Sequence, residues 1–165
     1  MKVEAVAKIP TGIRGLDEIV HGGLPSRRTT LFSGGPGVGK TVLAMEFLAR
    51  AAQAGTPGVL VSFEENEADL RLNAASLGID LHALEEQGTL RCLHAAVPHQ
   101  AVRAGDFDIQ GLMAILEGHL QDVKAECIVL DAVDVLLRVF GDPEREREEL
   151  YMLNDWLRER ELTTI

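Results

Sequence analysis

The sequence predicts an α/β fold in which a mostly parallel sheet is flanked by helices. Three observations support it: apolar strand-like runs alternate with helical runs, a glycine-rich loop joins the first run to a helix, and carboxylates follow two later runs. Such alternation implies parallel strands joined by right-handed crossovers, with the ligand at their carboxyl ends. Because 165 residues, 46% of them hydrophobic, suffice for one core, we expect a single domain over 1–165.

The elements are expected in the following order along the chain. We predict strands near 29–33, 58–63, 90–94 and 126–131, and helices near 40–53, 67–77, 109–123 and 144–160. Gly78 is a natural C-cap for the second helix. Residues 95–108 form the longest irregular stretch, and Thr163–Ile165 read as the start of another strand. We therefore expect the last strands of the sheet to be missing from this chain.

The final helix carries alternating charges at its start. Acidic and basic residues interleave over 144–149, which is typical of a solvated face with i,i+4 ion pairs. Leu150, Leu153 and Leu157 are expected to form its buried stripe, with Trp156 either beside them or at a contact surface.

The first predicted strand leads into a P-loop. Gly34 to Thr41 read G-x-x-x-x-G-K-T, in the strand–loop–helix context that this motif requires. The loop's N–H groups and the helix N-terminus surround phosphates, Lys40 reaches the β- and γ-phosphates, and Thr41 holds Mg²⁺. ATP or GTP is therefore the expected ligand. The expected nucleotide-binding residues are Gly34, Gly35, Pro36, Gly37, Val38, Gly39, Lys40, Thr41 and Val42.

A later apolar run ends in a carboxylate. Cys127–Asp131 has the Walker B form, in which Asp131 orients Mg²⁺ or a water bound to it. Buried parallel strands also end in Asp simply to cap a loop. The P-loop about ninety residues upstream favours the metal role for Asp131, beside Thr41.

Two adjacent glutamates follow the second predicted strand. Glu64 and Glu65 come after the run 58–63, at an edge that faces the ligand crevice. Hydrolysis needs a group that orients the attacking water and accepts its proton, and a glutamate here suits that role. Neighbouring side chains of an extended strand point to opposite sides, so one glutamate faces the water while the other tunes it or bonds locally. The alternative is an acidic start to the next helix.

An ordered series of motifs resembles the KaiC-like family of RecA-type ATPases. The matching segments run through the whole chain and are Ile9–Asp17, His21–Pro25, the P-loop, Ser62–Glu65, Asn73–Leu81 and Phe107–Ile109. One departure is Ala132, which stands where a member of the family has Ser after the Walker B Asp. Members of that family have later strands that carry a basic finger acting in trans and much of the base contact, and we expect these beyond residue 165.

The resemblance implies a RecA-like P-loop NTPase core and an Mg²⁺-dependent ATPase. It implies a ring, usually a hexamer, with ATP between subunits, and catalytic roles for Glu64 and Glu65. Lys40, which reaches the β- and γ-phosphates from the P-loop, is the third residue that we expect to be catalytic. Family members hydrolyse ATP slowly, and some also phosphorylate their own Ser/Thr residues. We therefore expect a signalling or clock-type role with protein partners.

Composition and charge bear on which partners the protein binds and where it is located. The net charge of −10 and the scattered basic residues disfavour nucleic acid. No apolar run is long enough to span a membrane and the start of the chain lacks a signal-peptide pattern, so a cytoplasmic location is expected. Cys92 and Cys127 are expected to be buried thiols, and the histidines show no metal-ligand spacing.

Two other functions stay open from the sequence. In the first, ATP is an assembly ligand for a docking module with negligible turnover. In the second, the chain is a DNA-repair ATPase of the RadA type, which the acidic charge and the missing N-terminal zinc ribbon disfavour.

Overall fold

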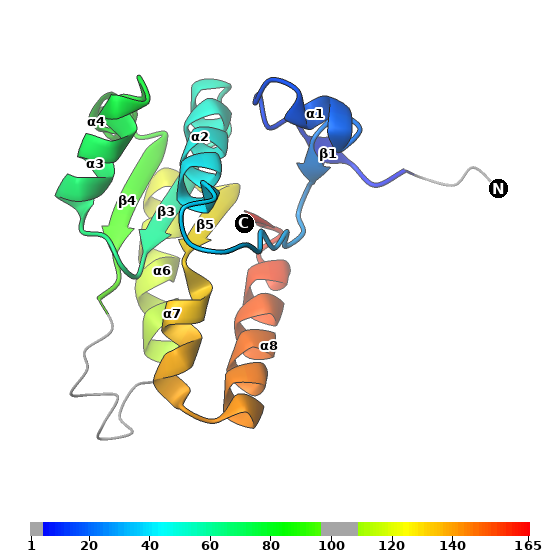
Figure 1. Ribbon diagram of the computed structural model, residues 1–165, viewed down its shortest axis with the longest axis vertical. Helices are drawn as coiled ribbons and strands as arrows, with labels where there is room; N and C mark the ends of the chain where they lie inside the picture. The colour runs from blue at the N-terminus through cyan, green and yellow to red at the C-terminus, as the bar shows by residue number, and fades with distance from the viewer. Residues whose placement is uncertain (1–4, 97–108) are drawn as a thin grey trace.

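The computed structural model describes residues 5–96 and 109–165. Most of the irregular stretch expected at 95–108, and Phe107 and Asp108 of the family pattern, lie outside these ranges. The described chain has three layers, with a parallel sheet between two groups of helices (Figure 1). No helix within this described part is both long and apolar enough to cross a membrane.

The central sheet has four parallel strands in the order β4-β3-β5-β6. Their bounds are Gly58–Ser62 for β3, Leu90–His94 for β4, Cys127–Asp131 for β5 and Thr163–Thr164 for β6. Ser62 is level with His94 on one side and with Asp131 on the other. The carboxyl ends of three strands thus form one even edge, as the strand–helix alternation predicted.

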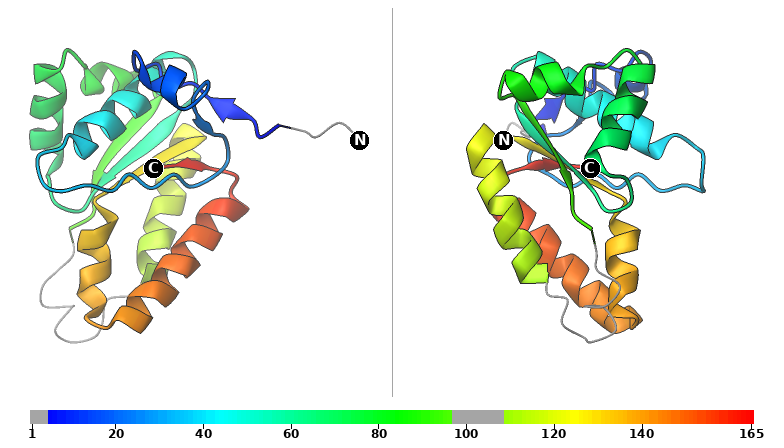
Figure 2. Two further views of the ribbon diagram at one scale, coloured as in Figure 1. Left: turned by 45° about the vertical axis from the view of Figure 1, so that its right-hand side comes forward. Right: turned by 90° about the vertical axis from the view of Figure 1, so that its left-hand side faces the viewer.

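Helices cover both faces of the sheet, as the edge-on view of Figure 2 shows. One face carries α2 (Lys40–Gln53), α3 (Glu67–Ser76) and α4 (Leu81–Glu86). The other carries α6 (Ile109–Val123), α7 (Val133–Leu137) and α8 (Pro143–Glu159). A 3₁₀ turn, η1 (Arg138–Phe140), joins α7 to α8.

Side-chain alternation along the strands divides the core in two. Leu60 and Val129 pack under α2, whereas Val61 and Ile128 pack under α6. Successive strand residues face opposite sides of a sheet, so Ser62 and Asp131 lie on the α2 face. This parity determines which end-of-strand side chains face the P-loop.

The strand predicted at 29–33 is wrong as a full strand. Only Thr29 forms a bridge, with Thr164 of β6, and the Thr30 N–H donates to the Thr164 carbonyl at 2.8 Å. The segment still lies beside β6, but a ladder needs a partner for each residue. The partner strand consists of Thr163–Thr164, and Ile165 is the last residue of the chain.

The other predicted elements are confirmed to within two residues at each end. Gly78 has φ +77° just after the end of α3, as predicted for a C-cap. In α8, Leu153 and Leu157 are buried, but Leu150 is 39% exposed, so its place in the buried stripe is wrong. Trp156 packs against the α6-side core, beside the stripe.

A small unit at the N-terminus was not predicted. The two-residue strands β1 (Lys8–Ile9) and β2 (Leu24–Pro25) pair antiparallel around the four-residue helix α1 (Leu16–Ile19). Asp17 holds this turn, since its carboxylate accepts hydrogen bonds from the Thr11 N–H, the Thr11 hydroxyl and the Gly12 N–H. These bonds, chiefly that from the Thr11 hydroxyl, lower the pKa of Asp17.

Candidate functional site

The P-loop runs along the carboxyl edge of the sheet to the N-terminus of α2 (Figures 1 and 2). Gly37 and Gly39 have φ of +76° and +90°, a region that L side chains adopt at a cost. Gly39 is the N-cap of α2, so its conformation turns the chain into the helix. Residues 33–39 are all exposed, so the loop is accessible to a ligand.

Lys40 closes the loop on itself. Its ammonium group donates hydrogen bonds to the carbonyls of Gly34, at 2.8 Å, and Gly35, at 3.0 Å. The positive charge is therefore already held over the loop that is expected to receive phosphate. An incoming phosphate oxygen has only to replace two carbonyls to engage this ammonium group.

The two residues predicted to serve a metal lie on the same side of the sheet. Thr41 is in the first turn of α2, and Asp131 ends β5 on the face that α2 covers. Both offer oxygen atoms, which suit Mg²⁺. The peptide bond between Asp131 and Ala132 is cis. Among residues 5–96 and 109–165, no three His, Cys, Asp or Glu side chains gather as a metal cage.

The two glutamates after β3 differ in their surroundings. Glu65 is half-buried, and its carboxylate accepts a hydrogen bond from the Asn73 amide at 2.8 Å. Glu64 is exposed, and its carboxylate has no hydrogen-bond or ion-pair partner within the described part of the chain. Because β3 neighbours β5, this carboxylate belongs to the same edge as Asp131.

Asn73 and Ser62 contact the glutamate loop, and neither residue was predicted to have a role there. The Ser62 hydroxyl accepts a hydrogen bond from the Glu65 N–H at 2.9 Å. Both residues fall inside segments that carried the family pattern, which was the only signal available. A contact over eight residues, from Glu65 to Asn73, follows from no short-range rule.

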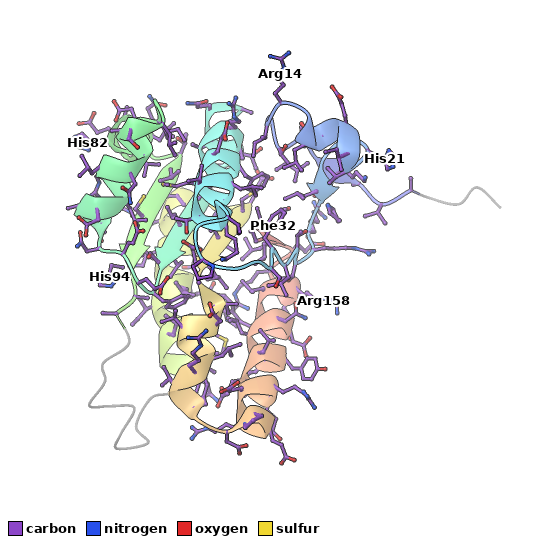
Figure 3. All side chains as sticks on the ribbon, viewed as in Figure 1. Arg14, His21, Phe32, His82, His94 and Arg158 are labelled. Carbon is purple, nitrogen blue, oxygen red and sulfur yellow. The ribbon has the colours of Figure 1, made fainter. Side chains whose placement is uncertain are left out.

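One described histidine, His94, ends β4 at this edge, level with Ser62. Arg14 and His82 lie away from it, in the upper part of the view in Figure 3. Cys92 and Cys127 are free and buried, as predicted. Burial raises the pKa of each thiol to about 12, which keeps both protonated.

Comparisons with known proteins show the family of this chain. A family model for the KaiC ATPase matches residues 9–165. The chain belongs to the KaiC family of ATPases. It is 38% identical to the circadian clock protein KaiC2 of Synechocystis sp. over 163 residues, covering 98% of this chain and 29% of that protein. It is 39% identical to the circadian clock oscillator protein KaiC of Thermostichus vulcanus over 162 residues, covering 97% and 31%.

A solved structure confirms the predicted fold. The crystal structure of a KaiC-like protein from the archaeon Pyrococcus horikoshii matches with a TM-score of 0.85 and 31% sequence identity, covering 98% of this chain and 69% of that one. The KaiC-family chain thus has the predicted RecA-like α/β core. It spans about 30% of the length of the curated relatives it matches.

Proposed function

We propose that this KaiC-family chain binds ATP with Mg²⁺ and hydrolyses it slowly, in a ring with a signalling or clock-type role. One observation carries the proposal. The P-loop, Asp131 and Glu64 each follow or end an element at the carboxyl edge of the sheet, and each has the chemistry that phosphoryl transfer to water needs. The family assignment supports nucleotide binding, and the reaction itself is our inference.

In the proposed reaction, a water oxygen attacks the γ-phosphorus in line with the bridging oxygen. The bond from the γ-phosphorus to that oxygen breaks and ADP leaves with its electron pair. Glu64 orients the water and accepts the proton that it loses. Lys40, shifted from the carbonyls of Gly34 and Gly35, stabilises charge on the β- and γ-phosphates.

Thr41 and Asp131 would hold Mg²⁺. These two residues suit Mg²⁺ because both offer oxygen atoms. In nucleotide sites Mg²⁺ takes one or two protein oxygens and completes its coordination shell with waters and phosphate oxygens. Thr41, at the start of α2, and Asp131, at the end of β5, would supply these two oxygens. When bound, the ion would offset the negative charge of the phosphates.

Replacing the glutamates tests the assignment of the base. The double variant Glu64→Gln, Glu65→Gln should release no phosphate above background and should still bind ATP, because neither side chain contributes to the P-loop. Thr56→Ala, on the loop before β3, is a matched control that should turn over ATP normally. Undiminished hydrolysis by the double variant would remove these residues from the catalytic role.

Ring assembly, as a hexamer with ATP at subunit interfaces, is part of the proposal. Apolar side chains around the P-loop support it, since Leu31, Val38 and Val42 are 75%, 64% and 40% exposed. Exposed apolar side chains beside a ligand site favour a surface that another subunit covers. Sedimentation with and without ATP-Mg²⁺ tests it, and Leu31→Ser, outside the nucleotide-binding residues, should weaken the assembly.

The same surface supports a second function, in which ATP is chiefly an assembly ligand for a ring that docks signalling proteins. Assembly that is equally strong with a non-hydrolysable analogue, together with background phosphate release, would favour it. Transfer of the γ-phosphate to the protein's own Ser or Thr residues is tested in the same samples with labelled ATP. The net charge of −10 makes nucleic acid an unsuitable partner.

A further inference from the structure

The loop between β3 and α3 is held by contacts on both sides of Glu64. On the strand side, Ser62 is 1% exposed and its hydroxyl accepts the hydrogen bond from the Glu65 N–H. On the helix side, the Asn66 side chain caps α3 by accepting hydrogen bonds from the N–H groups of Ala68 and Asp69, both at 3.0 Å. These contacts fix the backbone of the loop.

A third contact fixes a side chain in this loop. The Asn73 amide, in the second turn of α3, donates to the Glu65 carboxylate across eight residues. The amide carries no charge, so it satisfies one lone pair of Glu65 without neutralising the loop. Glu65 is thereby occupied, whereas Glu64 keeps its carboxylate without a partner in the described structure.

We propose that Asn73 is a positioning residue: by holding Glu65 against α3, it leaves Glu64 as the one carboxylate of the pair that faces the attacking water. This inference rests on the proposed function. It divides the glutamate pair into a catalytic member, Glu64, and a member that orients the loop, Glu65. A small displacement of a catalytic group lowers the rate strongly, because the reaction needs a near-attack geometry.

Steady-state kinetics of Asn73→Ala and Asn73→Asp test the inference. For Asn73→Ala we expect kcat to fall about tenfold, equivalent to losing one hydrogen bond to a charged group, while KM for ATP stays within about twofold. Asn73→Asp keeps the shape but loses the donor and adds a like charge, so its kcat should fall at least as far. Ser76→Ala is the matched control, because it also loses one hydrogen bond on α3, to the Asn73 carbonyl, without touching Glu65. Its kcat should equal that of the parent.

A double-mutant cycle separates positioning from simple stability. If Asn73 acts through Glu65, then Asn73→Ala should change kcat little in a Glu65→Ala background, where the hydrogen bond is already absent. If the two substitutions lower kcat independently, so that their effects multiply in the double variant, or if Asn73→Ala turns over ATP like the parent, the inference is overturned while the proposed ATPase stays intact. A parent protein that releases no phosphate would overturn the ATPase and this role together. Thermal unfolding of the same variants shows whether they are folded.

Discussion

Lys40→Met separates the stability of the P-loop from its function. The structure gives this ammonium group two hydrogen bonds, to the carbonyls of Gly34 and Gly35. They lie at an exposed loop, so together they contribute about 1 kcal/mol to folding. In the complex, two charge-assisted bonds to phosphate at the lower end of their range contribute about 3 kcal/mol. Because Lys40 gives up its two carbonyl partners when it binds phosphate, its net contribution to binding is about 2 kcal/mol. Losing it should weaken ATP affinity about 30-fold.

Lys8→Met is the matched control for that prediction. Lys8 also donates to two backbone carbonyls, those of Val20 and His21, but it lies in β1, away from the P-loop. We expect both variants to lose a similar free energy of unfolding in urea and only Lys40→Met to lose ATP affinity, measured by calorimetry. Parent-like binding by Lys40→Met, or an equal loss of binding in Lys8→Met, would refute the reasoning.

Three further predictions concern the scaffold. Gly23→Ala should lose at least about 2 kcal/mol of unfolding free energy, because φ is +122° and the new Cβ would lie 2.0 Å from the Ile9 carbonyl oxygen. Gly118→Ala, in α6 with open space around the new Cβ, should instead gain up to about 1 kcal/mol. Equal urea midpoints for the two variants would contradict this difference. Cys92 and Cys127 should resist a thiol reagent at pH 8 in the folded protein, since burial raises the pKa of both thiols to about 12, and both should react once urea unfolds the protein. Rapid labelling of the native protein would contradict this prediction. The hydrogen bond from the Arg160 guanidinium lowers the pKa of Glu117, so the ion pair contributes about 0.5 kcal/mol to the unfolding free energy above pH 4.5, and this contribution is lost as the pH falls. Glu117→Gln should therefore be less stable than the parent at pH 7 and equally stable near pH 3. A stability difference that stays constant with pH would contradict this prediction.

Local patterns predicted the elements that position the site. The glycine and lysine spacing of the P-loop located the start of α2 at Lys40, and the apolar run ending at Asp131 located β5. These predictions succeeded because each element is fixed by its own residues, through periodicity and capping.

The sequence could not show contacts that depend on distant residues. The strand expected at 29–33 failed because a ladder depends on its partner, here β6, and not on its own β-propensity. Leu150 was assigned to the buried stripe because i,i+3 spacing fits, yet burial depends on what packs against α8 at that turn. The Asn73–Glu65 contact is likewise set by how α3 docks on the sheet.

Phosphate release by the complete protein, measured alongside its mass in solution, tests the central claim most directly. We predict slow, Mg²⁺-dependent release of phosphate by a species that assembles with ATP. In Glu64→Gln, phosphate release should be lost while ATP binding is retained. A protein that binds ATP as a monomer and releases no phosphate, with the glutamates intact, would contradict it.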